Sequence, residues 1–226
     1  MIKIAILISG RGSNMVSLIN AVERKNLDCK VVCVIANKKS SGLALAKENN
    51  IPTKLINQFD YESKFHHELA LILELESHNP DWIFLAGYMA ILSSNFVEKF
   101  AGKIINIHPS LLPEFKGLNT HLRALKAGKK THGTTVHVVT NELDNGPIIA
   151  QSEIRILADE TVETLEHRIL QEEHVLYPII LESLVKKYIE IRLDKVTWLS
   201  VPPSLDGEIK NRNILIKPFL LLKNHN

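Results

Sequence analysis

The sequence predicts an α/β fold with a doubly wound, mostly parallel sheet and an antiparallel edge. Short apolar runs alternate with amphipathic segments of helical period over the first half of the chain, a pattern typical of parallel βαβ units. The first run leads straight into a glycine-rich turn at residues 9–14, as strands do before a helix in such sheets. Two later runs are joined only by the turn-forming stretch 141–146, which favours an antiparallel pair at the edge.

Each element follows from a local pattern. Apolar runs predict buried strands at residues 3–9, 30–36, 53–56, 81–86 and 103–107. Apolar residues at helical spacing, with serine or threonine caps and a glycine stop, predict helices at residues 15–24, 42–48, 63–77, 93–100 and 120–127. The antiparallel strands are expected at 134–140 and 147–156, followed by a long helix at 161–187 with Thr161 as its N-cap.

Size and charge favour one domain that acts on small molecules. The chain has 226 residues, of which 45% are hydrophobic, enough for an α/β domain over 1–190. Residues 191–226 are expected to form a poorly defined C-terminal extension rather than a second domain. The 27 basic and 25 acidic residues nearly balance, which argues against a nucleic-acid surface. No apolar run reaches the length of about 18 residues that a membrane helix needs. The apolar N-terminus is interpreted as a strand rather than a signal peptide, so a cytoplasmic protein without membrane partners is expected.

Cysteine and histidine spacing gives no indication of a metal site. Cys29 and Cys33 have no matching pair of ligands nearby and are expected to be reduced thiols. No two histidines have the spacing of metal ligands on one helix, so no metal is expected. Most of the 10 histidines are expected to be structural or exposed, and His137 lies on an alternating strand where it faces either the core or a cleft.

The segment 106–113 is the most informative part of the chain. Asn106 and His108 are two residues apart at the end of an expected strand, so their side chains point to the same face. Pro109 cannot donate to a strand ladder and turns the chain into a loop. An amide and a titratable base held together on rigid backbone suit acyl-type transfer. In such a reaction the amide stabilises a developing oxyanion and the imidazole moves a proton.

Two further polar features have both a structural and a functional interpretation. Asp144 lies in a turn-forming stretch, where it either bonds its own backbone or orients His108 and favours the protonated ring. The turn at 9–14 is either a tight connection with Ser13 as N-cap or a site where a phosphate meets free amides at a helix start. Met15 stands where a dinucleotide-binding fingerprint needs a third glycine, so a nicotinamide cofactor is disfavoured.

Together these motifs resemble the glycinamide ribonucleotide transformylase family, the folate-dependent phosphoribosylglycinamide formyltransferases of purine synthesis. The matching segments stand in the family's order, at 9–14, 36–38, 85–92, 106–113, 132–137, 142–147 and 173–178. The segment 106–113 marks folate formyltransferases in general, and 9–14 narrows the resemblance to the glycinamide ribonucleotide branch and its near relatives. The resemblance implies a Rossmann-like formyltransferase fold.

The resemblance also implies a reaction and a set of site residues. A formyl group would pass from 10-formyltetrahydrofolate, a cosubstrate, to the amino group of 5-phosphoribosylglycinamide by direct attack through a tetrahedral intermediate, in de novo purine synthesis. The family's catalytic trio corresponds to Asn106, His108 and Asp144. The implied substrate-binding residues are Gly12, Ser13, Asn14 and Glu173, and the implied folate-binding residues are Lys64, Met89, Ala90, Ile91, Leu92 and Asn106. The partners would be small molecules, with no metal, and the chain a monomer or homodimer.

The chain departs from the family pattern at the expected folate site. Ala90 stands where relatives usually have arginine, and Lys64 where they carry an arginine near the folate glutamate tail. Lysine keeps the charge but loses the bidentate contact, so these changes bear on folate affinity more than on the reaction. Two alternatives remain open: another folate-dependent formyltransferase, and a non-catalytic phosphate- or folate-binding module on the same scaffold.

Overall fold

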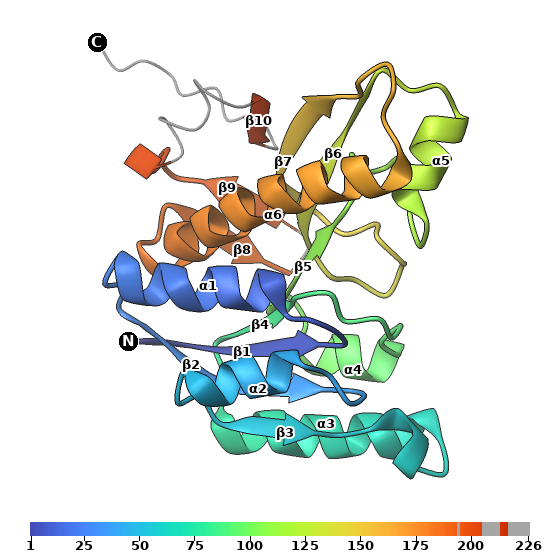
Figure 1. The fold of residues 1–226 in the computed structure, drawn as a ribbon. Helices are drawn as coiled ribbons and strands as arrows, with labels where there is room; N and C mark the ends of the chain where they lie inside the picture. Colours follow the sequence, from blue (N-terminus) through green and yellow to red (C-terminus); the bar gives the residue numbers. More distant parts are fainter. Residues whose placement is uncertain (194, 205–212, 217–226) are drawn as a thin grey trace. The chain divides into compact units, whose positions relative to one another are not determined.

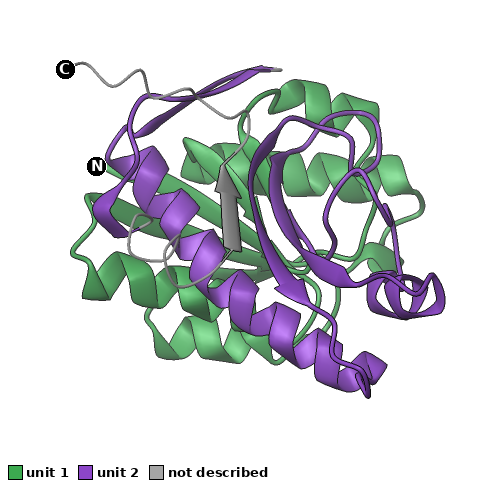
Figure 2. Ribbon diagram, turned by 90° about the horizontal axis from the view of Figure 1, so that it is seen from above, with its two compact units in different colours: residues 1–106 green, residues 107–226 purple. Residues whose placement is uncertain are grey.

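The chain divides into two compact units, each with its own secondary structure. The computed structural model describes residues 1–193, 195–204 and 213–216. The units are Met1–Asn106 and Ile107–Asn226, shown in separate colours in Figure 2. Among the described residues, none of the helices combines the length and apolarity that crossing a bilayer requires.

Met1–Asn106 is a parallel α/β unit. Its strands are β1 (Ile2–Ile8), β2 (Cys29–Ala36), β3 (Thr53–Leu55), β4 (Trp82–Leu85) and the first part of β5 (Ile104–His108). They pair in parallel in the order β5-β4-β1-β2-β3. The chain runs outward from β1 to β3 and then returns to the other side of β1 with β4. This reversal is the expected doubly wound pattern, and ligands of such sheets bind beyond the carboxyl ends of the strands at the reversal.

Helices and caps complete the first unit. The helices are α1 (Ser13–Arg24), α2 (Gly42–Glu48), η1 (Gln58–Asp60), α3 (Lys64–His78) and α4 (Ser94–Lys99), labelled in Figure 1. Helices α1 and α2 pack against β2. Ser63 and Ser93 cap α3 and α4, because their side chains accept hydrogen bonds from the first-turn amides. Strand β1 lies in the core, and every side chain from Ile4 to Ile8 is fully buried.

Ile107–Asn226 combines antiparallel strands with one long helix. Strands β6 (Thr131–Val138) and β7 (Ile148–Arg155) pair antiparallel, and β10 (Asn213–Ile216) adds to the other edge of β7. Helix α6 (Val162–Val185) packs against both β6 and β7, and α5 (Thr120–Lys126) contacts α6 (Figure 1). Thr161 caps α6 in a reciprocal box with Thr164, as its sequence position predicts. The antiparallel edge expected from the sequence is confirmed.

The described residues of the C-terminal extension include strands that the sequence analysis did not predict. Strands β8 (Ile189–Arg192) and β9 (Lys195–Trp198) form a hairpin that begins before residue 190. The indole Nε1 of Trp198 donates to the Ile149 carbonyl at 3.1 Å, which ties the hairpin to β7. The apolar–polar alternation of 189–192 and 195–198 was the available signal for these strands.

Two local expectations have different outcomes. Ser13 is not an N-cap, because Gly12 holds that position with φ of 78° and Ser13 is the first residue of α1. Only glycine adopts this backbone without steric cost, which explains the turn sequence. Cys29 and Cys33 are free and buried, and burial raises the pKa of both thiols to about 12. The expectation of reduced thiols is consistent with this environment.

Candidate active site

Strand β5 presents Asn106 and His108 at its carboxyl end, on the same face of the strand. Asn106 is half-buried, and His108 is 6% exposed. The backbone beside His108 is fixed by two threonines of β6. The hydroxyl of Thr134 donates to the His108 carbonyl at 3.0 Å, and that of Thr135 donates to the Ser110 carbonyl at 2.6 Å. The imidazole therefore stands on backbone that is anchored on both sides of Pro109.

The imidazole of His108 lies between two hydrogen-bond acceptors. Its Nδ1 is 3.4 Å from Oδ2 of Asp144, and its Nε2 donates to the Phe115 carbonyl at 3.0 Å. The carboxylate of Asp144 thus faces His108, and the Asp144 turn does more than bond its own backbone.

Asp144 is held in a strained, well-defined conformation. Its φ is 47°, in the left-handed region that aspartate and asparagine tolerate better than most residues. Its Oδ2 accepts a hydrogen bond from the Gly117 amide at 2.8 Å, and its side chain is 9% exposed. Gly146 nearby can carry no side chain, because a Cβ there would stand 1.8 Å from the Val138 carbonyl oxygen. The turn therefore fixes where the carboxylate points.

A second imidazole faces Asp144, and the sequence left its direction undecided. His137 is 2% exposed, and its Nε2 lies 3.8 Å from Oδ1 of Asp144. Its Nδ1 donates to the Val138 carbonyl at 3.0 Å, and burial lowers its pKa, so the ring is neutral. The pairing of β6 with β7 shifts register between Val136 and His137. That irregularity is the reason why strand alternation could not assign the side chain to core or cleft.

A pair of neutral histidines stands in the same unit. His121 Nδ1 and His132 Nε2 are 3.2 Å apart, and their rings are nearly perpendicular at 87°. Burial, then the neighbouring imidazole, lowers the pKa of His132 to about 4, and burial also lowers the pKa of His121. The described part of the chain contains no cluster of three or more histidine, cysteine, aspartate or glutamate side chains that could hold a metal ion.

Glu173 reaches the same region from α6. It is 6% exposed, and its Oε1 lies 3.5 Å from the hydroxyl of Thr134. Thr134 also bonds the His108 carbonyl, so one side chain separates Glu173 from the backbone of His108. Of the predicted site residues, His108, Asp144 and Glu173 are brought together within Ile107–Asn226, and Asn106 precedes them on β5.

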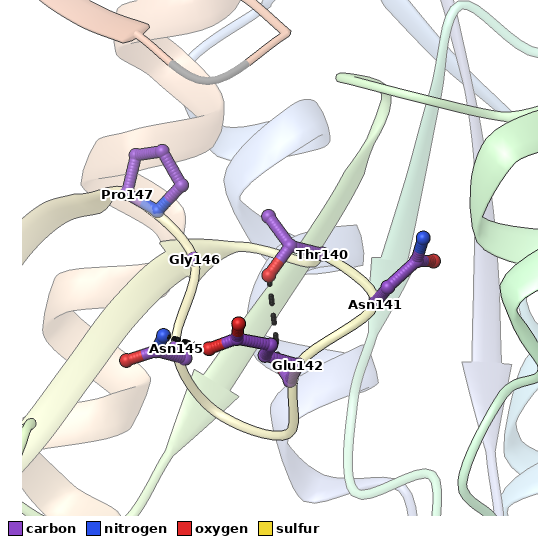
Figure 3. Close-up of a pocket in the computed structure, with 6 residues that line it drawn as sticks. All are labelled: Thr140, Asn141, Glu142, Asn145, Gly146 and Pro147. Carbon is purple, nitrogen blue, oxygen red and sulfur yellow. Dashed lines mark hydrogen bonds between the residues drawn. The ribbon is translucent and has the colours of Figure 1, made fainter.

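The turn that carries Asp144 also borders a cavity. Figure 3 shows this cavity, with a volume of about 610 Å³, lined by Thr140, Asn141, Glu142, Asn145, Gly146 and Pro147. The Asn145 amide donates to the Glu142 carboxylate, and the Thr140 hydroxyl donates to the Glu142 carbonyl at 3.4 Å (Figure 3). These bonds within the turn fix the shape of the cavity wall beside Asp144.

The remaining predicted binding residues lie in Met1–Asn106, and those that follow β1 and β4 lie at the reversal of the strand order. Gly12, Ser13 and Asn14 begin α1, and no side chain caps that helix. The start of a helix attracts an anion through its first amides and its dipole. Met89 follows β4, and its amide donates to the hydroxyl of Ser9 at 2.7 Å. Ser9 is the first residue of the glycine-rich turn at 9–14, so the two predicted binding segments meet at this hydroxyl.

The predicted folate segment has an exposed surface and few internal bonds. The side chains of Met89 and Ile91 are each 66% exposed. Within the described part of the chain, no hydrogen bond to another residue is made by Ala90, Ile91 or Leu92. Lys64 begins α3 with a side chain that is 56% exposed, and its Nζ lies 3.8 Å from Oε1 of Glu68.

Comparison with known proteins gives the family. The sequence profile of the formyl transferase family matches residues 2–181. The phosphoribosylglycinamide formyltransferase of Haemophilus influenzae is 40% identical over 198 residues, which cover 87% of this chain and 93% of that protein. The protein of the same name from Escherichia coli is 37% identical over 204 residues, with 88% and 96% covered.

Solved structures agree with the sequence comparison. The phosphoribosylglycinamide formyltransferase of Coxiella burnetii superposes with a TM-score of 0.83 at 39% identity, covering 87% of this chain and 93% of that chain. A formyltetrahydrofolate deformylase from Pseudomonas syringae superposes with a TM-score of 0.80 at 27% identity, covering 88% of this chain and 66% of that one. The chain belongs to the formyl transferase family, in the branch of the phosphoribosylglycinamide formyltransferases.

Proposed function

We propose that this chain transfers the formyl group of 10-formyltetrahydrofolate to the amino group of 5-phosphoribosylglycinamide, a step of de novo purine synthesis. The observation that carries the proposal is the contact between His108 Nδ1 and Asp144 Oδ2 at 3.4 Å. His108 lies two residues after Asn106 on β5. The family profile and the 40% identity to a phosphoribosylglycinamide formyltransferase support the choice of substrates.

In the proposed mechanism, the amine nitrogen attacks the formyl carbon, and the carbonyl electron pair moves onto oxygen. The Asn106 amide and the His108 imidazolium donate hydrogen bonds to this oxyanion. Collapse of the intermediate breaks the bond from carbon to the folate nitrogen. The proton lost by the amine reaches that nitrogen through His108 or a bound water. The products are the formylated amine and tetrahydrofolate. Asp144 stabilises the imidazolium and orients the ring.

Binding of the two substrates is assigned to separate segments. The phosphate is proposed to lie at Gly12, Ser13 and Asn14, where the uncapped start of α1 supports anion binding. Glu173 is proposed to contact the glycinamide ribonucleotide. Lys64 and the segment Met89, Ala90, Ile91 and Leu92 are proposed to bind the folate. The backbone groups of 90–92 that bond no other described residue support recognition of the polar edge of a pterin.

The remaining parts of the proposal concern organisation. Residues 1–190 are proposed to form the formyltransferase domain, and the family profile over 2–181 supports this range. Residues 191–226 are then an extension that contributes strands without forming a domain of its own. A cytoplasmic location, a monomeric or homodimeric state, and a reaction without metal belong to the same proposal.

The test is a direct assay with three acceptor conditions. The purified chain is mixed with 10-formyltetrahydrofolate and either phosphoribosylglycinamide, an alternative amine, or no acceptor, and absorbance of the deformylated folate is followed. Turnover that requires phosphoribosylglycinamide supports the proposal, and His108→Ala should then lower kcat by about 10²- to 10³-fold. Formate release without an acceptor would instead favour a deformylase, to which the chain is also structurally similar. No turnover under any condition would favour a binding module.

A further inference from the structure

The conformation of the predicted folate segment at 90–92 is not fixed by hydrogen bonds of its own. Residues 90–92 form neither helix nor strand, and they bond no other described residue. A three-residue stretch of this kind costs conformational entropy to order when a ligand binds. Its geometry before binding must therefore come from whatever holds its two ends.

The first end is held by Ser9. The Ser9 hydroxyl accepts a hydrogen bond from the Met89 amide at 2.7 Å and donates to Oδ1 of Asn37 at 2.7 Å. The Ser9 amide donates to the Gly87 carbonyl at 3.1 Å. Ser9 and Asn37 are 3% and 2% exposed, so neither lies where a substrate would touch it directly.

The second end is held by Glu68 of α3. Its Oε1 accepts a hydrogen bond from the Ser93 amide at 2.8 Å, and its Oε2 accepts one from the Ser93 hydroxyl. Ser93 directly follows Leu92 and caps α4. Glu68 is only 5% exposed, although Lys64 supplies a positive charge 3.8 Å away. Both carboxylate oxygens thus bond the residue at which the folate segment ends.

Packing alone does not explain why a carboxylate is buried at Glu68. A buried carboxylate loses hydration, and an apolar side chain of similar size would often stabilise the fold as well or better. The same charge also acts on Tyr88 at the start of the segment. Burial, then the nearby Glu68 carboxylate, raises the pKa of the Tyr88 hydroxyl, so it stays neutral. Glu68 therefore acts on residues at both ends of the segment between Tyr88 and Ser93.

We infer that Ser9 and Glu68 are positioning residues that clamp residues 89–93 from both ends, so that the segment is ordered before the folate binds. The inference rests on the proposed role of this segment in folate binding. It predicts that breaking either contact weakens folate binding, and that breaking the Glu68 contact leaves the ribonucleotide site intact. Glu68 should matter more, because hydrogen bonds to a buried charge are stronger than those between neutral groups.

The experiment compares Glu68→Ala, Glu68→Gln and Ser9→Ala with the unchanged chain. Glu74→Gln is the matched control, because Glu74 lies on the same helix but pairs with Lys54 and His78. For Glu68→Ala we expect the KM for formyl-folate to rise about ten- to a hundredfold. The KM for phosphoribosylglycinamide should stay within about twofold. Glu68→Gln should recover most of the loss, because an amide can still accept from the Ser93 amide and donate to its hydroxyl.

Calorimetric titration with 10-formyltetrahydrofolate alone separates this inference from the proposed reaction. Weaker folate binding by Glu68→Ala at an unchanged melting temperature supports the clamp even if the chain does not use phosphoribosylglycinamide. An equal rise of both KM values, or folate binding as tight as in the Glu74→Gln control, would overturn it. An unchanged chain that fails to bind the folate at all would overturn both the clamp and the proposed function. If Glu68→Ala does not fold, Ser9→Ala replaces it, because this variant removes the hydroxyl that the Met89 amide bonds and should also weaken folate binding relative to the Glu74→Gln control.

Discussion

Replacing Asp144 by asparagine removes one charge and little else. The backbone at this position has φ of 47°, which asparagine adopts as readily as aspartate, whereas alanine would add strain. The asparagine Oδ1 can still accept the hydrogen bond that Gly117 now donates to the carboxylate at 2.8 Å. The substitution therefore isolates the effect of the negative charge on His108.

The expected size of the effect follows from the distance. Two unit charges separated by 3.4 Å attract by about 5 kcal/mol at an effective dielectric of 20 and by about 1 kcal/mol in bulk water. Both side chains are less than 10% exposed, at 7% and 9%, so the environment lies between these limits. A loss of about 3 kcal/mol in stabilisation of the imidazolium corresponds to about a hundredfold decrease in kcat.

The measurement is steady-state turnover of formyl-folate, with thermal unfolding as a check on the fold. Asp159→Asn is the control, because Asp159 is an exposed residue in the turn before α6. We expect kcat to fall about a hundredfold in Asp144→Asn with KM values nearly unchanged, since the charge stabilises the His108 imidazolium that faces the oxyanion and does not act on the bound substrates. A variant that keeps more than about a third of the normal kcat would refute the assigned role, because so small an effect is below the bulk-water limit.

Three further predictions concern stability. The pKa of His132 is lowered from 6.5 to about 4 in the folded chain, so as the pH falls the unfolded chain takes up this proton before the folded chain does. About 3 kcal/mol of stability that is present above pH 6.5 should therefore be lost as the pH falls through about 4. Urea titrations at pH 7 and pH 4.5 measure this, and equal stability at both would contradict it. Gly146→Ala should destabilise the chain by more than about 3 kcal/mol, since the new Cβ would meet the Val138 carbonyl oxygen at 1.8 Å, and a normal melting temperature would contradict this. Thr161→Ala should lower the free energy of unfolding by about 1 kcal/mol, because it removes the cap of α6. Calorimetry should show a melting temperature lower by about 2–4 °C, and the turnover assay should show full activity.

The parallel half of the fold could be predicted because its signals are local. β1 contains an uninterrupted apolar run from Ile4 to Ile8, α3 follows a serine that caps it, and the α2 range agrees with expectation at both ends. The local sequence did not decide whether Asp144 contacts His108, since an aspartate before Asn145 and Gly146 fits either a structural turn or a catalytic role. The family resemblance pointed to the role, and the tertiary contact could not be read from spacing along the chain.

Other features escaped prediction because they depend on tertiary packing. The direction of His137 depends on a register shift between two strands, and strand alternation alone cannot reveal such a shift. Glu68 lies in a helix whose sequence offers no reason to bury a carboxylate. Its importance appears only when Ser93, 25 residues away, is placed beside it. The strands after residue 188 were missed because short alternating segments near a chain end give a weak signal.

The hydrogen bond from His108 Nε2 to the Phe115 carbonyl has a consequence for how tightly a reactant is held. A substrate oxygen can accept a hydrogen bond from His108 Nε2 only after it displaces the Phe115 carbonyl, so one hydrogen bond replaces another of similar strength. This exchange of hydrogen bonds contributes little to the affinity for the substrate in its ground state. It becomes favourable once the incoming oxygen gains negative charge, because a charged acceptor outcompetes a neutral peptide group. If His108 has its proposed role, the Phe115 carbonyl therefore favours binding of the transition state over binding of the substrate.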